Sequence, residues 1–130
     1  MKKHIEVVAA LIQKNKKVLA TQRGYGQFQG GWEFPGGKIE SHETQEQALK
    51  REIQEELGVM IEVHDLCKTI EYAYPDFDLT MHCFWCTMQE DHFVLKEHMA
   101  YQWVDKNTLK EIDWLPADLE LLDEIEKVLA

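Results

Sequence analysis

The alternation of hydrophobic and polar residues near the start of the chain predicts an opening β-hairpin. Residues 5–12 begin with an alternating pattern, residues 17–21 form a second run typical of a strand, and the polar stretch 13–16 separates them. Further runs rich in β-branched and aromatic residues follow, with a turn predicted at 75–78. These runs cover residues 59–63, 67–74, 79–88 and 101–104. We therefore expect two hairpins and one short additional strand.

Two segments carry helical signals instead. Thr44 and Gln47 form a capping-box pattern, and Gly58 suits a left-handed C-terminal cap, so we predict a helix over about 45–57. In residues 117–129, apolar side chains recur at helical spacing, which predicts a closing amphipathic helix. These are Leu119, Leu122, Ile125 and Leu129. The order β-β-α-β-β-β-α predicts a mixed α/β domain.

Composition narrows the class of protein. A chain of 130 residues with 45% hydrophobic content suits one domain, here residues 1–130. Its net charge of −10 disfavours binding to a nucleic-acid polymer, but a free nucleotide can still bind through divalent cations. No export signal or membrane-spanning apolar run is found, and three irregularly spaced cysteines fit a reducing compartment. We expect a cytoplasmic monomer or homodimer without membrane partners.

Three glutamates of the predicted helix form an acidic cluster. At about 100° per residue, Glu52, Glu55 and Glu56 fall on one face, where like charges destabilise an isolated helix unless a cation compensates. Oxygen ligands favour Mg²⁺ or Mn²⁺ over zinc. The competing interpretation is an ordinary solvated acidic face. An adjacent apolar stripe would fix the helix against a sheet: Leu49, Ile53 and Leu57.

The wider pattern is far more specific than the acids alone. Residues 37–59 fit G-x5-E-x7-R-E-U-x-E-E-x-G-U at every specified position, where U is aliphatic. This segment resembles the Nudix box, the signature of Nudix hydrolases, and residues 32–40, 71–76 and 115–118 are similar to the MutT-type branch. The resemblance implies an α/β/α sandwich with a central mixed sheet, and hydrolysis of a nucleoside diphosphate linked to another group.

The resemblance also assigns the metal-binding and catalytic residues. It implies that the Mg²⁺ ligands, with Mn²⁺ as an alternative ion, come from carboxylates and a backbone carbonyl. These are Gly37 (or Gly36), Glu52, Glu55, Glu56 and Glu97. Glu43 and Arg51 match positions that brace the loop and helix through a salt bridge. Either Glu52 or Glu97 is expected to act as the general base, and attack at the β-phosphorus would release a nucleoside monophosphate and pyrophosphate.

Substrate-binding residues are assigned more loosely. Arg23 could contact phosphate or base, Phe34 and Tyr74 could line the base, and Asp118 occupies a position where the enzyme specialised for oxidised guanine has asparagine. Gly36 and Lys38 complete this group. The competing interpretations are a surface arginine, ordinary core aromatics and a helix N-cap for Asp118.

Four functions remain compatible with the sequence. The first is a triphosphate pyrophosphohydrolase for 8-oxo-dGTP or a related damaged nucleotide, and the second is the same reaction on CTP or 5-methyl-dCTP. The third is a Nudix enzyme for ADP-ribose or dinucleoside polyphosphates, and the fourth is a non-catalytic binder of metal or nucleotide.

Two other motifs give weaker evidence of a function. The glycine-rich loop 24–31 lacks the ending of a P-loop, and Cys83 and Cys86 should face opposite sides of a strand.

Overall fold

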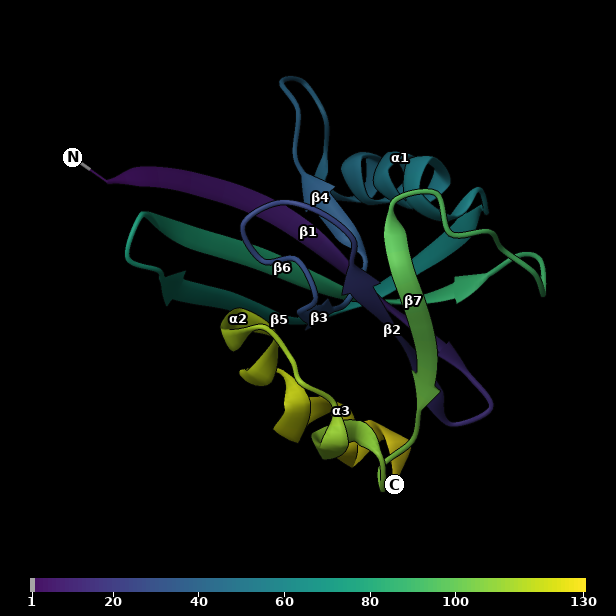
Figure 1. Ribbon diagram of the computed structural model, residues 1–130. Helices are drawn as coiled ribbons and strands as arrows, with labels where there is room; N and C mark the ends of the chain where they lie inside the picture. Colours follow the sequence, from purple (N-terminus) through teal and green to yellow (C-terminus); the bar gives the residue numbers. More distant parts are fainter. Residues whose placement is uncertain (1) are drawn as a thin grey trace.

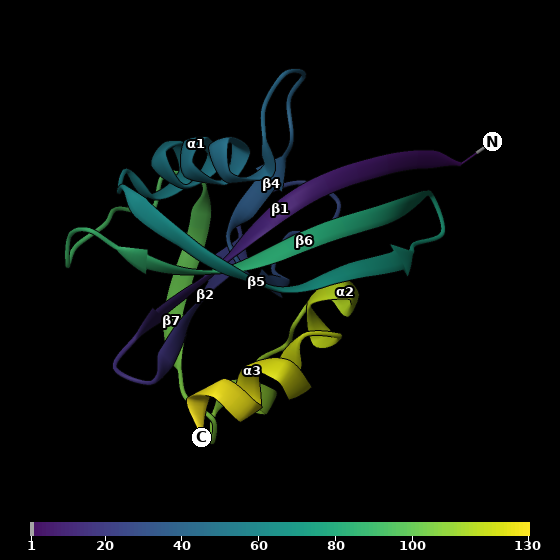
Figure 2. The same cartoon turned by 180° about the vertical axis from the view of Figure 1, so that it is seen from behind.

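The fold consists of a central mixed β-sheet with helices on both faces (Figure 1). It is seen in a computed structural model that describes residues 2–130. The elements are β1 (Lys3–Lys14), β2 (Lys17–Arg23), β3 (Trp32–Glu33), β4 (Gly36–Lys38), α1 (Gln45–Leu57), β5 (Ile61–Ala73), β6 (Phe77–Met88), β7 (His98–Val104), the 3-10 helix η1 (Leu109–Glu111), α2 (Pro116–Leu119) and α3 (Leu122–Leu129). Helix α1 lies on one side of the sheet, and α2 and α3 lie on the other (Figure 2). The expected α/β/α sandwich is confirmed.

Strand β1 organises the sheet. The main order is β3-β2-β1-β6-β5, with β4 added on β1 and β7 added on β2. Strands β1 and β2 are antiparallel, as are β5 and β6, so both predicted hairpins are confirmed. The long parallel pairing of β1 with β6 joins the two hairpins into one sheet.

The alternation along β1 sorts its side chains into two cores. Val8, Ala10 and Ile12 pack with the apolar stripe of α1, whereas Ala9 and Leu11 pack with residues of α3. This is the geometry of a strand whose successive side chains point to opposite faces. Cys83 and Cys86 follow the same rule on β6, because Cys83 belongs to the α3 side and Cys86 to the α1 side. Their predicted separation is confirmed, and both thiols are free.

Helix α1 has the predicted bounds because both of its ends are capped. The Thr44 hydroxyl accepts from Gln47 N, the Gln47 side chain accepts from Thr44 N, and Gly58 closes the helix at φ 65°. Its apolar stripe is completely buried. Burial of this stripe fixes the rotation of α1 and therefore the direction of its glutamates.

Two expected boundaries are wrong. Most of the runs 59–63 and 67–74 belongs to one strand, β5, which begins at Ile61 and ends at Ala73, because irregularities between Val63 and Lys68 let the pairing with β6 continue through polar residues. The closing helix is divided into α2 and α3. Asp118, buried within α2, accepts a hydrogen bond from Phe34 N, so α2 is tied to the segment after β3 while α3 packs its own apolar stripe.

Candidate active site

A cavity of about 660 Å³ opens beside β1 and β4 and extends to the face of α1. One end is acidic and the other is aromatic. Every residue that the sequence assigned to metal, catalysis or substrate lines it except Glu43 and Arg51. The fold thus brings together side chains from β1, β2, β3, β4, α1, β6 and α2, together with Tyr74 just after β5 and Glu97 just before β7.

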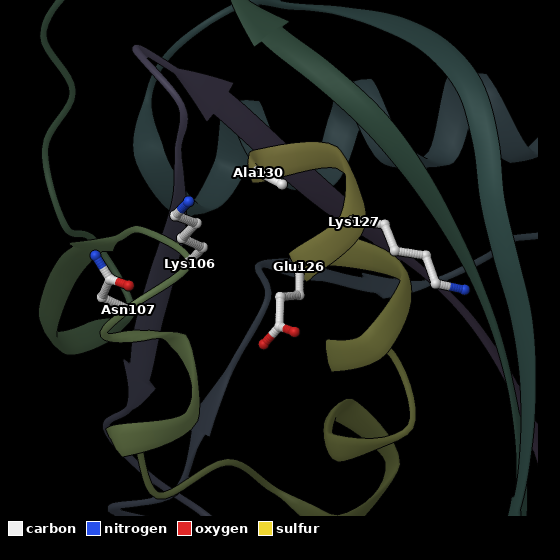
Figure 3. A pocket seen from close by; sticks show the side chains of 5 residues that line it. All are labelled: Lys106, Asn107, Glu126, Lys127 and Ala130. Atoms are coloured by element: carbon white, nitrogen blue, oxygen red, sulfur yellow. The ribbon is translucent and has the colours of Figure 1, made fainter.

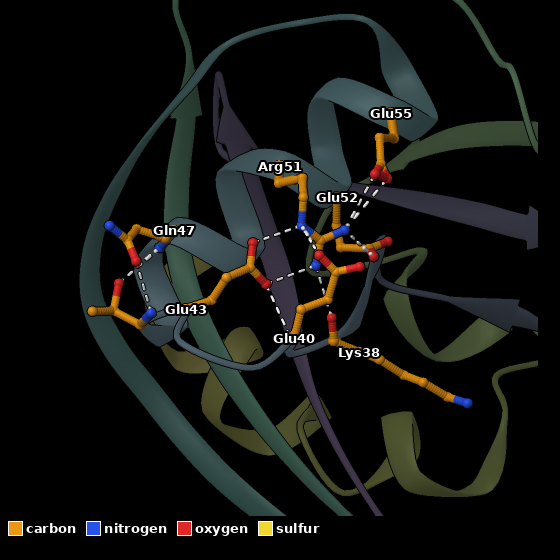
Figure 4. A network of polar contacts seen from close by, with 8 residues as sticks. Lys38, Glu40, Glu43, Gln47, Arg51, Glu52 and Glu55 are labelled. Carbon is orange, nitrogen blue, oxygen red and sulfur yellow. Dashed lines mark hydrogen bonds and ion pairs between the residues drawn. The ribbon is translucent and has the colours of Figure 1, made fainter.

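Glu43 and Arg51 form the brace behind the acidic end (Figure 4). Arg51 donates from Nε to Glu43 Oε2 at 2.6 Å and from Nη2 to Glu43 Oε1 at 2.9 Å. The same guanidinium donates to the Lys38 carbonyl at 3.0 Å, so it joins the end of β4 to α1. The hydrogen bonds from Arg51 hold the pKa of Glu43 at about 2. The Lys38 side chain points away from this cluster and lines the cavity.

The acidic end is formed by the box glutamates. Arg51 Nη1 donates to Glu52 at 2.8 Å and to Glu55 at 3.2 Å, which orients both carboxylates toward one side of α1. Glu56 instead points into the interior and is only 6% exposed. Among residues 2–130, no three His, Cys, Asp or Glu side chains already form a metal-holding group. Arg51 is the counter-charge of Glu52 and Glu55 in this arrangement.

Glu56 is the most perturbed group of the site. Burial is the main reason that its pKa rises to about 10, and a hydrogen bond with Glu52 and the charges of Glu52, Glu33 and Glu97 act in the same direction. Its Oε1 atom is buried and has no hydrogen-bond partner among the described residues. Such a carboxylate is costly to bury unless a cation or donor compensates it.

These residues fit a hard divalent cation. Their donors are carboxylate oxygens, with the Gly37 carbonyl as the expected backbone ligand, which is the donor class of Mg²⁺ and Mn²⁺. Glu52 lies so close to Gly37 that a Cβ there would be 2.2 Å from Glu52 Oε2. The backbone of β4 and the carboxylates of α1 thus approach each other without an intervening side chain. The four candidate carboxylates are Glu52, Glu55, Glu56 and Glu97.

A polar network that the sequence analysis missed continues from Glu56 to Arg23. Arg23 donates to both oxygens of Glu33, from Nη2 at 2.7 Å and from Nε at 3.2 Å. His98 Nε2 lies 3.3 Å from Glu33 Oε2 and 3.7 Å from Glu56 Oε1. Burial alone would raise the pKa of Glu33, but His98 and Arg23 hold it below its ordinary value. Arg23 is therefore a partly buried, paired side chain rather than a free surface arginine.

Asp118 and Phe34 define the floor of the aromatic end. Phe34 stacks on Trp114 at 4.4 Å between ring centroids, and its backbone N–H donates to Asp118 Oδ1 at 3.0 Å. Burial raises the pKa of Asp118 to about 8, although the Phe34 hydrogen bond opposes the rise. Leu115, not Asp118, is the N-cap of α2, so the N-cap interpretation is wrong. Near neutral pH the uncharged acid, which both donates and accepts, is populated.

Aromatic side chains from three other segments enclose this end. Tyr74 is buried and its hydroxyl accepts from Ala117 N at 3.1 Å. It contacts Phe28 at 5.2 Å and Phe77 at 4.9 Å between ring centroids. Phe28 and Phe77 are not predictable from the sequence, because nothing in the order of residues places the loop 24–31 beside the β5–β6 turn. Tyr25 of that loop donates to Glu97 at 3.0 Å at the acidic end.

A second hollow, of about 460 Å³, lies between α3 and the segment after β7 (Figure 3). It is lined by Lys106, Asn107, Glu126, Lys127 and Ala130. Glu126 already pairs with Lys110, and Lys127 points away from Lys106. These surface side chains do not converge on a common point, so the cavity beside α1 is the candidate site.

No helix in residues 2–130 is long and apolar enough to cross a membrane.

Comparison with known proteins agrees with this geometry. A family model described as a NUDIX domain matches residues 2–125. The chain is 35% identical over 122 residues to a CTP pyrophosphohydrolase of Escherichia coli K12, covering 93% of this chain and 90% of that protein. It is 32% identical over 130 residues to an 8-oxo-dGTP diphosphatase of the same strain, covering 98% and 100% of the two. The solution structure of the E. coli protein ORF135 matches with a TM-score of 0.83 and 33% identity, over 99% of this chain and 93% of that one. The chain belongs to the Nudix family.

Proposed function

We propose that this chain, acting as one domain over residues 1–130, hydrolyses a nucleoside triphosphate to a nucleoside monophosphate and pyrophosphate. The observation that carries the proposal is the single cavity that runs from the box carboxylates to an aromatic end. Its acidic end suits a phosphate chain with a bound cation, and its aromatic end suits a base. The relatives named as a CTP pyrophosphohydrolase and an 8-oxo-dGTP diphosphatase support the same reaction class.

The acidic end supports a divalent cation, which we propose to be Mg²⁺. Glu52, Glu55, Glu56 and Glu97 would hold it together with the Gly37 carbonyl. Bound there, the cation would neutralise charge on the phosphate oxygens and orient the attacking water. The Glu43–Arg51 brace keeps β4 and α1 at a fixed separation, and Lys38 and Arg23 are the cations that can contact phosphate.

The proposed reaction is attack of water on the β-phosphorus. The new bond joins the water oxygen to this phosphorus, the bond to the oxygen bridging the α- and β-phosphates breaks, and Glu52 or Glu97 takes the proton. Hydrolysis in ¹⁸O-labelled water should therefore place the label in pyrophosphate. Label in the nucleoside monophosphate would instead indicate attack at the α-phosphorus.

For the base, the first candidate is 8-oxo-guanine or a related damaged purine. The neutral form of Asp118 offers the donor and acceptor of an asparagine, so Asp118→Asn should keep 8-oxo-dGTP turnover. The second candidate is cytosine, whose exocyclic amine would donate to an ionised Asp118. Under that alternative, Asp118→Asn should lose activity on CTP and 5-methyl-dCTP.

The proposal is tested by measuring pyrophosphate release with Mg²⁺ over a panel of substrates. The panel contains 8-oxo-dGTP, dGTP, CTP, 5-methyl-dCTP, dATP, ADP-ribose and a dinucleoside polyphosphate. Glu55→Gln should lose activity, whereas Glu62→Gln, an exposed glutamate of β5 outside the cavity, should keep it. Activity that survives Glu55→Gln, or turnover confined to ADP-ribose or the dinucleoside polyphosphate, would contradict the proposal.

A further inference from the structure

A buried histidine, His98, lies between the box carboxylate Glu56 and the Arg23–Glu33 pair. The His98 side chain is 5% exposed, and its Nε2 is within 3.3 Å of Glu33 Oε2 and 3.7 Å of Glu56 Oε1. Both carboxylates are themselves largely buried, with side chains 14% and 7% exposed. A histidine buried only for packing would be surrounded by apolar side chains, whereas Nε2 of His98 faces two carboxylates.

A local irregularity of β7 places the imidazole there. Gln22 pairs with Ala100, but the next residue, Arg23, pairs with His98 rather than Met99. One extra residue of β7 is thus accommodated at this point, as in a β-bulge, which redirects a side chain at the end of a ladder. His98 consequently shares the face of Arg23 and reaches Glu33.

The surroundings of the imidazole are polar rather than apolar. A cavity of about 40 Å³ is bounded by Arg23, Glu33, Glu56 and His98, among others. Two buried atoms have no hydrogen-bond partner in residues 2–130, and both belong to this cluster: Glu56 Oε1 and His98 Nδ1. Glu56 Oε1 faces His98 Nε2 at 3.7 Å, a charge contact longer than a hydrogen bond, while Arg51 pairs with the neighbouring Glu52 and Glu55.

We propose that His98 is a positioning residue that connects the metal-binding end of the site to Arg23. Its Nε2 keeps the Glu56 carboxylate directed toward the other box acids and keeps Glu33 aligned against Arg23. This inference rests on the proposed function, because it gives Glu56 a role as ligand and Arg23 a role with nucleotide. Partners that orient a metal ligand typically change metal affinity or activity by about 10–100-fold when they are removed.

The experiment compares Mn²⁺ binding to the full chain, without nucleotide, by the loss of the free Mn²⁺ signal in electron paramagnetic resonance. His98→Phe keeps a ring but removes both nitrogens, so it should weaken Mn²⁺ binding by about 10–100-fold. His98→Gln places an amide donor near the position of Nε2 and should restore most of the affinity. His64→Phe, at an exposed histidine of β5, is the matched control and should bind as the wild type does.

Thermal unfolding of each variant separates positioning from folding. If His98→Phe does not fold, His98→Asn takes its place with the same expectation, because its shorter amide does not reach Glu56. Unchanged Mn²⁺ affinity in a folded His98→Phe variant, or no rescue by His98→Gln, would overturn the proposal. A wild type that binds Mn²⁺ but hydrolyses no triphosphate would refute the proposed function alone, since this comparison uses no nucleotide.

Discussion

Gly36 and Gly37 are adjacent in β4, yet alanine at each position should have opposite consequences. A Cβ on Gly37 would lie 2.2 Å from Glu52 Oε2 and 2.4 Å from Glu52 Cδ. A Cβ on Gly36 would lie 2.0 Å from the Val8 carbonyl oxygen and 2.8 Å from Ala9 Cα. The first obstacle is the end of a flexible side chain, and the second is the backbone of the central strand. Gly37→Ala should therefore impair function, and Gly36→Ala should impair folding.

The sizes of the two effects follow from these contacts. Ordinary contact begins at 3.4 Å, so Glu52 must withdraw by about 1.2 Å in Gly37→Ala, and displacement by about 1 Å costs roughly 100-fold in rate. Overpacking against a fixed backbone costs about 1–3 kcal/mol or more. With an unfolding entropy of about 0.27 kcal/mol/K for a chain of this length, Gly36→Ala should lower Tm by roughly 4–11 °C.

The assay measures kcat/KM for the best triphosphate substrate together with Tm by calorimetry. Gly37→Ala should lower kcat/KM and keep the Tm of the wild type. The main effect of Gly36→Ala should be a lower Tm. Full activity in Gly37→Ala would refute the role of Glu52 at this position. An equal decrease of Tm in both variants would show that the side-chain obstacle and the backbone obstacle do not differ in their effect on folding.

Three further predictions concern stability. Glu43 has a lowered pKa of about 2, so its contribution to folding stability is present above the unfolded pKa of 4.5 and is lost as pH falls toward 2. The Tm difference between wild type and Glu43→Gln should therefore shrink as pH falls from 4.5 to 2, and a constant difference would contradict this expectation. Asp118 has a raised pKa of about 8, so the folded protein loses stability as pH rises from 3.8 to 8. Asp118→Asn should remove this loss, giving a Tm advantage that grows over that range in calorimetry and vanishes below it, whereas a pH-independent difference would argue against a buried acid. Thr44→Ala removes the capping box and should cost about 1 kcal/mol in urea unfolding, while Gln45→Ala, at a half-buried neighbour outside the capping box, should be nearly neutral.

The sequence by itself determined the elements whose signals are local. The capping pair of Thr44 and Gln47, Gly58 and the apolar stripe of α1 lie within a few residues of one another, so their spacing sets the helix and the direction of its acids. The resemblance to the Nudix box likewise implied the Glu43–Arg51 brace, and the structure has two hydrogen bonds between these side chains. Strand-forming runs and the turns between them predicted both hairpins for the same reason.

Only the tertiary structure decided the contacts between segments that are distant along the chain. Strands β3 and β4 are too short to show a period, and β4 forms because β1 supplies its hydrogen-bond partners. His98 meets Glu33 across 65 positions, and Asp118 meets Phe34 N across 84. No periodicity encodes such pairs, since they depend on the parallel pairing of β1 with β6, the irregular pairing at Arg23 and the packing of α2. The burial that raises the pKa of Asp118 is likewise a property of the assembled fold, because desolvation depends on neighbours from every layer.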